Sequence, residues 1–139
     1  MDDCVFCRIV RGELAASKVY EDDDTLVIMD IQSVNPGHML VLSKPHRSNI
    51  YALEDTLAGA LFRTAARMAR TVKQELGCEG VTLLQTNEIA GNQTVFHFHI
   101  HVLPRWTDDG MALSWPAKNP PRKALEEMAV RLRRALATE

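Results

Sequence analysis

The sequence lacks both a long apolar run and a strong excess of charge. No apolar run approaches the roughly 18 residues that a membrane-spanning helix needs. The formal net charge is −2, which excludes the general affinity for nucleic acid of a strongly basic chain. The segment 1–4 has neither the positive start nor the apolar stretch of a signal peptide. We therefore expect a cytoplasmic protein that binds neither membranes nor nucleic acid.

Cysteine is also scarce, and the sequence has no internal repeat and no glycine-rich phosphate loop. The three cysteines are an odd number, which fits a reducing compartment better than a disulfide framework. Two of them form the motif Cys4-Val5-Phe6-Cys7. A single Cys-x-x-Cys motif is typical of a redox pair or of half a zinc site, and no second copy completes a four-cysteine site. Two reduced, partly buried thiols are the third interpretation.

The most informative stretch is 94–103, Thr-Val-Phe-His-Phe-His-Ile-His-Val-Leu. The chain has five histidines, and three of them, His97, His99 and His101, alternate here with apolar residues. β-Branched and aromatic residues favour a strand, and alternate side chains of a strand share a face. We therefore expect the apolar row to face the core and the histidine row to face a metal, an anion or a reacting group. A helix would scatter the three histidines.

The remaining pattern predicts an α+β fold in one domain, as the length of 139 residues also indicates. Short apolar runs bounded by turn residues predict strands, and apolar residues three or four apart predict helices. The expected strands are 18–21, 25–30, 39–42, 80–86 and the histidine segment; the expected helices are a short turn at 8–12, a long helix at 54–76 and a last helix at 122–137. Asn35-Pro36-Gly37-His38 has the chemistry of a type II turn, and Gly77 suits a helix end. We expect a mainly antiparallel five-stranded sheet with the long helix packed on it and a C-terminal helix.

These motifs resemble those of the histidine triad family, whose signature is three histidines that alternate with apolar residues and are followed by two more. The segment 97–103 matches this signature at every position. The resemblance covers about residues 4–106 and includes, in order, Cys-x-x-Cys, Asp30, Pro-Gly-His at 36–38, Lys-Pro-His at 44–46 and Gln93 ahead of the histidines. One departure is Asn92, which stands where the family usually has glycine. Asparagine tolerates a positive φ better than most residues, so we expect the turn to survive.

The resemblance implies a structural zinc site. One branch of the family carries an N-terminal Cys-x-x-Cys that binds zinc together with two histidines. On this sequence the implied ligands are Cys4, Cys7, His46 and His97. Four protein ligands leave no open position for water, so this zinc would not be needed for the chemical step.

The resemblance also implies a nucleotide site. The middle histidine, His99, is the implied nucleophile toward the α-phosphorus of a nucleotide, and water or another acceptor then resolves the nucleotidyl-imidazole. Imidazole titrates near neutral pH, so a neutral ring can attack while a charged neighbour stabilises the phosphate oxygens. The other implied catalytic residues are His101, Gln93, Thr94 and His38, and the implied substrate contacts are Asp30 for the ribose hydroxyls, Ile28 for the base, Asn87, Gln93, Thr94, His99 and His101.

The expected function is a nucleotide hydrolase that cleaves purine nucleoside phosphoramidates or related adenylylated compounds to the nucleoside monophosphate. The alternatives are a dinucleoside polyphosphate hydrolase, a nucleotidyltransferase, a non-enzymatic nucleotide-binding interaction module and a purely metal-binding protein. The resemblance further implies a homodimer, which the family forms through the long helix and the strand after it. We expect 1–106 to form the histidine triad domain and 107–139 to be a variable C-terminal extension packed on the same domain.

Overall fold

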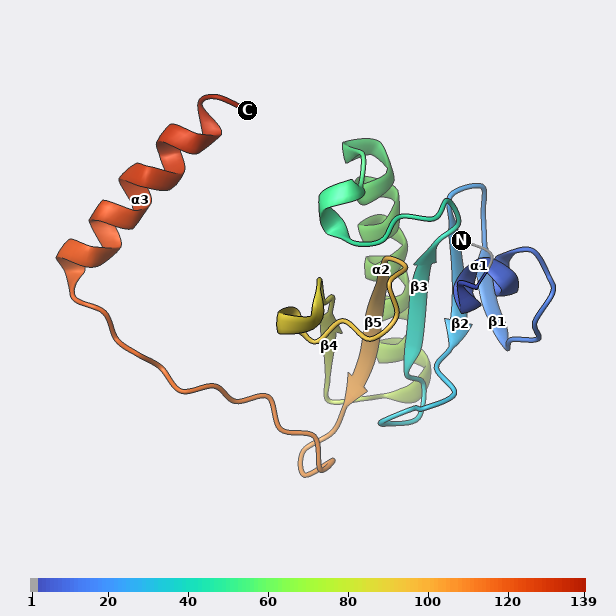
Figure 1. Ribbon diagram of the computed structural model, residues 1–139. Helices are drawn as coiled ribbons and strands as arrows, with labels where there is room; N and C mark the ends of the chain where they lie inside the picture. Colours follow the sequence, from blue (N-terminus) through green and yellow to red (C-terminus); the bar gives the residue numbers. More distant parts are fainter. Residues whose placement is uncertain (1–2) are drawn as a thin grey trace.

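The computed structural model describes residues 3–139, and its centre is a sheet of five antiparallel strands (Figure 1). The strands are β1 (Lys18–Glu21), β2 (Thr25–Met29), β3 (Met39–Ser43), β4 (Gly80–Leu84) and β5 (His99–Arg105), in the order β1-β2-β3-β5-β4. The helices are α1 (Val5–Val10), α2 (Asp55–Leu76) and α3 (Arg122–Leu136), with short 3₁₀ turns η1 (Ile50–Ala52) and η2 (Ile89–Gly91). The expected α+β architecture is confirmed. The first two residues of the expected domain lie outside the described part of the chain.

The alternation of side chains along the strands divides the core into two clusters. One face of the sheet, with Val41, Phe98 and Ile100, packs on the apolar stripe of α2. The opposite face packs on α1, where Leu42 and Phe6 belong to one buried cluster. The apolar row of the histidine segment therefore faces the α2 core, as the alternation predicts.

Strand β5 begins at His99, later than the expected strand, so His97 lies just before the regular ladder. The backbone of Phe98 instead bonds to the last residue of β3 and to the segment that follows β3. Its N–H donates to the carbonyl of Arg47 (2.7 Å), and its carbonyl accepts from the N–H of Ser43 (3.3 Å). Because this segment carries His46, the two bonds bring His97 and His46 side by side.

Three predicted turn residues adopt the expected backbone conformations. Gly37 has φ 86°, and the N–H of His38 donates to the carbonyl of Asn35 at 3.2 Å, as in a type II turn. Gly77 ends α2 in the left-handed region. Asn92 has φ 71°, so it takes the conformation for which the family usually has glycine.

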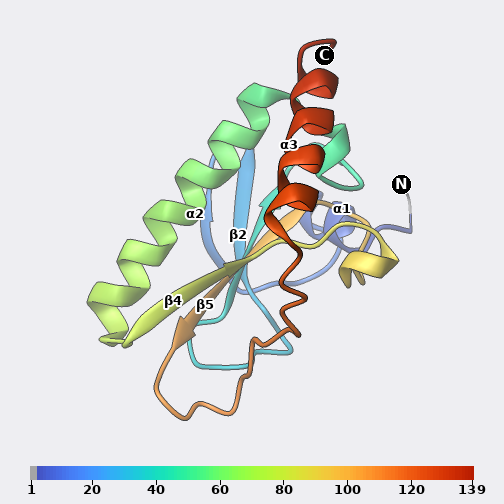
Figure 2. The same cartoon turned by 90° about the vertical axis from the view of Figure 1, so that its left-hand side faces the viewer.

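Beyond β5 the chain turns at 106–111 and then leaves the sheet as an extended segment that ends in α3 (Figures 1 and 2). We call residues 112–139 the C-terminal arm. None of the residues of α3 is buried, and the helix stands apart from the sheet of its own chain (Figure 1). The expectation that the extension packs on the same domain is thus not met by α3. In the described part of the chain no helix is both long enough and apolar enough to cross a membrane.

Candidate active site and metal centre

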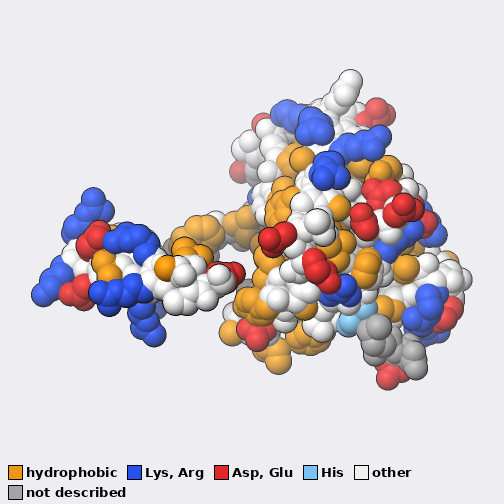
Figure 3. Space-filling view, turned by 90° about the horizontal axis from the view of Figure 1, so that it is seen from above, with side chains coloured by type: hydrophobic (Ala, Val, Ile, Leu, Met, Phe, Trp, Pro, Cys, Tyr) orange, Lys and Arg blue, Asp and Glu red, His pale blue; other side chains and the backbone are white. Residues whose placement is uncertain are grey.

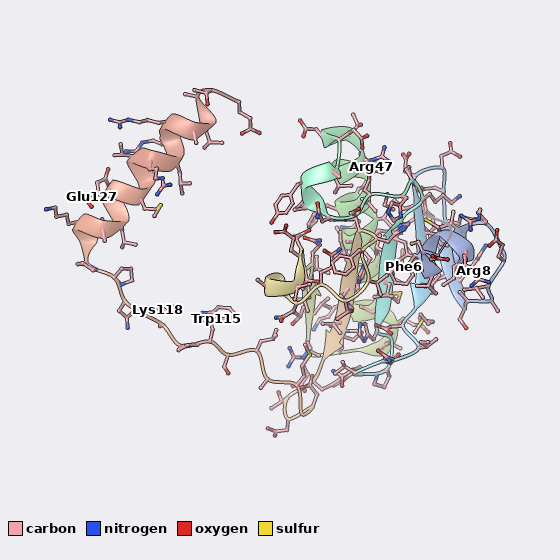
Figure 4. All side chains as sticks on the ribbon, viewed as in Figure 1. Phe6, Arg8, Arg47, Trp115, Lys118 and Glu127 are labelled. Atoms are coloured by element: carbon pink, nitrogen blue, oxygen red, sulfur yellow. The ribbon has the colours of Figure 1, made fainter. Side chains whose placement is uncertain are left out.

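A pocket of about 470 Å³ opens on the face of the sheet that carries α1. Five of the residues that the sequence singled out line it: Ile28, Asp30, Thr94, His99 and His101. The rest of the lining is largely apolar and includes Phe6, Ile9, Leu14, Ala16, Leu40 and Val95. Figure 4 shows Phe6 between α1 and the sheet. An apolar cavity of this size with a few convergent polar groups is typical of a small-molecule site.

The orientation of His99 is set by the backbone. Its side chain is buried, and Nδ1 lies 2.7 Å from the carbonyl oxygen of His97. A carbonyl oxygen can only accept, so Nδ1 carries the proton and Nε2 keeps its lone pair. Burial lowers the pKa of His99 below its usual value, which favours the neutral ring. The edge of Phe6 holds the ring from the side, with centroids 5.1 Å apart.

The turn before His38 determines which ring nitrogen of His38 carries the proton. The N–H of Val34 donates to Nδ1 of His38 (3.1 Å), so a neutral His38 carries its proton on Nε2. This Nε2 lies 2.9 Å from Nδ1 of His101 and donates to it. The proton of a neutral His101 then sits on its own Nε2, where it is a hydrogen-bond donor. Burial lowers the pKa of His38, and burial with the nearby His99 and His38 lowers the pKa of His101 to about 4.

Asp30 lies beside this histidine pair. Its Oδ1 accepts from the N–H of Gln32 (2.8 Å), and its Oδ2 is 3.3 Å from Nε2 of His38 and 3.8 Å from Nδ1 of His101. Its carboxylate opposes the lowering of both histidine pKa values. Asp30 therefore faces both the histidine pair and the pocket.

Four potential metal ligands meet behind the pocket: Cys4, Cys7, His46 and His97. Nδ1 of His97 is 3.3 Å from Sγ of Cys4, 3.5 Å from Sγ of Cys7 and 3.2 Å from Nδ1 of His46. Nδ1 of His46 is in turn 3.2 Å from Sγ of Cys7. Around a tetrahedral zinc ion such N–N and N–S separations would be about 3.3 to 3.6 Å. The donor set and its spacing therefore fit zinc.

At this candidate metal centre the backbone leaves the coordinating nitrogen of His97 free and orients one of the sulfurs. Nε2 of His97 donates to the carbonyl of Ser43 at 2.6 Å, so the lone pair lies on Nδ1, which faces the cysteines. Burial lowers the pKa of His97 to about 4, which keeps the ring neutral, as ligation requires. The N–H of Cys7 donates to Sγ of Cys4 (3.4 Å) and orients that sulfur.

A second group with metal-like spacing consists of Asp30, His38 and His101. Here the backbone occupies the wrong nitrogen for ligation. Because the N–H of Val34 points at Nδ1 of His38, a neutral ring has its proton on Nε2, the atom that would have to bind the ion. The group is therefore better suited to hold a proton than a metal.

Two residues that the resemblance placed at the substrate do not reach the pocket. Both amide atoms of Gln93 are engaged, since Oε1 accepts from the N–H of Glu88 (2.7 Å) and Nε2 donates to the carbonyl of Ser48 (2.6 Å). The side chain of Asn87 exchanges hydrogen bonds with Gln85 and accepts from the N–H of Ile50 (2.8 Å). Their amides shape the loop between β4 and β5 instead of lining the cavity.

Sequence reasoning missed the wall that α1 and the segment after it build over the pocket. The signal was present in Phe6 and Ile9, two apolar residues that flank Cys7 in a short helix. Once the cysteines join the histidines, these side chains must lie over the histidine face.

Comparison with protein families gives one match that covers most of the chain. A model described as the HIT domain matches residues 11–108. The chain belongs to the HIT family. This HIT-family chain is also 30% identical, over 115 residues, to an adenosine 5′-monophosphoramidase of Schizosaccharomyces pombe, with 82% of this chain and 84% of that protein covered.

Solved structures agree with the fold. A HIT family protein of Bacillus anthracis overlays with a TM-score of 0.92 at 35% identity and covers 96% of this chain and 97% of its own. Since the C-terminal arm makes up about a fifth of this chain, that overlay includes the arm. A zinc-bound histidine triad family protein of Mycobacterium smegmatis overlays with a TM-score of 0.75 at 30% identity and covers 99% of both chains.

Proposed function

We propose that this chain hydrolyses purine nucleoside 5′-phosphoramidates, or related adenylylated compounds, to the nucleoside monophosphate. The observation that carries the proposal is a buried, neutral His99 at the pocket, with Nδ1 pinned to a carbonyl and Nε2 left as a nucleophile. Membership of the HIT family supports nucleotide hydrolysis in general. Similarity to a protein named as an adenosine 5′-monophosphoramidase supports the phosphorus–nitrogen bond as the target.

The first step is attack on phosphorus. Nε2 of His99 forms a bond to the α-phosphorus, and the phosphorus–nitrogen bond breaks. The leaving nitrogen takes the electron pair of that bond and a proton from solvent, and departs as the amine. The carbonyl of His97 accepts from Nδ1–H and stabilises the positive charge that the ring acquires. His101 donates Nε2–H to a phosphate oxygen, because His38 holds its other nitrogen.

The second step hydrolyses the intermediate and regenerates the free enzyme. Water attacks the nucleotidyl-His99 at phosphorus, the bond from phosphorus to Nε2 breaks, and the monophosphate leaves with the water oxygen. The product proton leaves through solvent or through the chain formed by His101 and His38. Asp30 lies beside this pair of histidines, and its negative charge favours a transient imidazolium.

The remaining pocket residues bind the nucleoside. We assign Asp30 to the ribose hydroxyls, Ile28 and the apolar wall to the purine base, and Thr94 to the phosphate. An apolar wall of aliphatic and aromatic side chains suits the face of a purine.

We further propose that zinc binds Cys4, Cys7, His46 and His97. A bound zinc would fix the segment that carries the carbonyl of His97, and it would take no part in bond making.

We also expect a cytoplasmic homodimer. The outer edge of β4 is the end of the sheet and is open to a second copy.

The test is release of AMP from adenosine 5′-phosphoramidate by wild type and by His99→Ala. We expect turnover by wild type and a loss of roughly several hundredfold or more in the variant. Phe96→Ala is the matched control, because it removes an aromatic ring from the same segment but outside the pocket. Trapping of an adenylylated chain after a quench in alkaline denaturant, in which the bond from phosphorus to imidazole survives, tests the intermediate, which should be absent in His99→Ala.

Two results would count against the proposal. If wild type released no AMP, the phosphoramidate assignment would fail, and dinucleoside polyphosphates and phosphate acceptors would be tried next. If His99→Ala matched wild type, His99 would not be the nucleophile.

A further inference from the structure

Helix α1 and the residue before it contribute to the candidate metal centre and to the pocket at once. Cys4 and Cys7 are two of the four candidate zinc ligands, and Phe6 between them lines the pocket. The ring of Phe6 stands nearly perpendicular to the ring of His97 in the metal centre, with centroids 5.7 Å apart. It meets the ring of His99 in the same way, with centroids 5.1 Å apart. One helix of six residues therefore joins the two sites.

Side chains, and not the backbone, hold α1 on the sheet. In the described part of the chain, no backbone hydrogen bond joins residues 3–16 to a strand. The helix is held by apolar packing of Phe6 and Ile9, and by the contacts of its two cysteines with the histidines of the candidate metal centre. A helix of this length is not stable by itself in water. Loss of the cysteine contacts should therefore loosen this wall of the pocket.

The two sulfurs are also placed to react with each other. Cys4 is the N-cap of α1 and Cys7 lies in its first turn, where the N–H of Cys7 donates to Sγ of Cys4 (3.4 Å). The two sulfurs lie within 4.8 Å of each other. Rotation of the two side chains can bring them to the disulfide bond length of about 2.05 Å. Cys-x-x-Cys is also the spacing that is typical of thiol–disulfide exchange.

The three cysteines differ in their access to solvent. Cys4 is partly exposed, whereas Cys7 and Cys78 are buried. All five histidines lie at the pocket or at the candidate metal centre, and a histidine side chain is visible at the surface of the domain in Figure 3. This region is therefore open to solvent. Cys78 belongs to the core under α2, on the other face of the sheet from α1. A small reagent can thus reach Cys4, and the partner available to Cys4 is Cys7.

We propose that Cys4 and Cys7 are a thiol–disulfide exchange site, and that their oxidation by a low-molecular-weight disulfide opens the pocket. Sγ of Cys4 attacks one sulfur of the small disulfide, whose S–S bond breaks, and one small thiolate leaves with the electron pair. Sγ of Cys7 then attacks Sγ of Cys4, the bond between the two cysteines forms, and the second thiolate leaves. The two cysteines lose two electrons in total, and the small disulfide becomes two thiols when its thiolates take protons from water.

Oxidation removes both sulfur ligands of the candidate metal centre. The thiolate is the form of cysteine that binds a metal, and His46 and His97 alone leave a zinc ion two ligands short. The ion is therefore released, and α1 loses the link that holds Phe6 against His99. The inference rests on the zinc site and the nucleotide pocket proposed above. It adds that a thiol pair controls nucleotide affinity and that, by linkage, bound nucleotide favours the reduced, zinc-bound pair.

The test follows zinc, thiols and nucleotide affinity on the same samples. Wild type and Cys78→Ala, which keeps only the thiol pair, are loaded with zinc and incubated with mixtures of oxidised and reduced glutathione. A chromophoric chelator measures zinc release, peptide mass mapping detects the disulfide, and equilibrium dialysis gives the dissociation constant of AMP. In both chains we expect one zinc ion released per disulfide formed. The dissociation constant of AMP should rise by about tenfold or more, and dithiothreitol with zinc should reverse both changes.

Cys4→Ser is the matched control, because it replaces one sulfur by oxygen and leaves Cys7 without a partner. It should bind zinc more weakly from the start, but its dissociation constant for AMP should not respond to oxidised glutathione. In Cys7→Ser the reaction should stop at the mixed disulfide between Cys4 and glutathione, which mass spectrometry detects.

Three results on zinc-loaded wild type would overturn the inference: no disulfide between the two cysteines in oxidised glutathione alone, zinc retained after the disulfide has formed, or an unchanged affinity for AMP after zinc has left. A response of Cys4→Ser equal to that of wild type would also overturn it, because the oxidised group would then lie elsewhere. Samples without oxidant keep the proposals apart. A reduced chain that binds no zinc contradicts the zinc site and the inference with it. A chain that binds AMP but releases none from the phosphoramidate contradicts only the proposed chemistry.

Discussion

The molecule contains two histidine clusters of nearly the same size, and they favour opposite chemistry. In the candidate metal centre of Cys4, Cys7, His46 and His97, ring nitrogens and sulfurs lie 3.2 to 3.5 Å apart. The second cluster consists of Asp30, His38 and His101, and we call it the proton group because His38 donates a proton to His101. Its corresponding separations are 2.9 to 3.8 Å. Distance alone would assign a metal to both.

The difference lies in which ring nitrogen the backbone occupies. At His97 the carbonyl of Ser43 takes the proton-bearing nitrogen and leaves a lone pair for a metal. At His38 the N–H of Val34 takes the lone pair and leaves a proton facing His101. One backbone acceptor and one backbone donor therefore separate a ligand from a proton donor on the same kind of side chain.

The largest expected effect is on metal binding. Cys7→Ser should weaken zinc binding by more than about a hundredfold, since even loss of a supporting residue can cost that much. Asp30→Asn and His38→Gln should leave one zinc per chain at unchanged affinity. Competition with a chromophoric chelator, with zinc counted by mass spectrometry, measures both. Two ions per wild-type chain, one of them lost in Asp30→Asn, would erase the distinction between the clusters.

The next effect is on turnover through the proton group. His38→Ala should lower kcat/KM for adenosine 5′-phosphoramidate by about tenfold to a hundredfold, because His101 no longer has a fixed proton position. His38→Gln should recover part of this loss, since its amide can still donate to Nδ1 of His101. Zinc content should stay constant in both. Equal activity of the two variants would argue against a donor role for His38.

Acid should affect zinc binding and turnover at different pH values. The nucleophile must be neutral, and burial lowers the pKa of His99, so kcat/KM should hold until the pH falls below the ordinary imidazole value of about 6.5. Zinc affinity should fall earlier, because burial raises the pKa of the Cys7 thiol and protons compete for the sulfur. Measurement of AMP release and of zinc affinity over the same pH series gives the pH at which each falls. A fall in kcat/KM that begins at or above pH 7 would contradict a neutral, buried His99.

The smallest effect concerns the turn that carries His38. A Cβ at Gly37 would lie 2.5 Å from Cδ1 of Leu76 and 3.1 Å from Cγ of Pro104, at φ +86°. Gly37→Ala should therefore destabilise the fold by about 2 kcal/mol and lower Tm by several degrees. Gly59→Ala is the control, because nothing lies within 4 Å of its added Cβ and alanine favours α2. Thermal unfolding compares the two variants. Equal Tm values would show that the turn accommodates the added Cβ without loss of stability.

The parts of the fold that depend on local chemistry could be predicted. The alternation around His99 assigns the two faces of β5, and Gly37 and Gly77 mark a turn and a helix end. Asn92 takes the positive φ expected for a glycine substitute. In each case neighbouring residues determine the conformation, so the pattern is readable without tertiary contacts.

The parts that depend on distant partners could not. Gln93 carries an amide that either a phosphate or a loop can satisfy, and only the position of Ser48, far along the chain, decides for the loop. The proton positions on His38 and His97 follow from backbone atoms that no motif specifies. The apolar face of α3 was visible in the sequence as a stripe, but not that its own sheet would leave it uncovered.

The contact between Cys4 and His97 also constrains how the chain folds. These residues are 93 positions apart, so joining them closes most of the domain into one loop. Loop-closure entropy grows only slowly with length, but contacts of this range slow folding. During synthesis from the N-terminus, α1 has no histidine strand to dock on until β5 has emerged. The nascent chain therefore cannot complete its pocket until β5 has emerged, although α1 is the first element to be made.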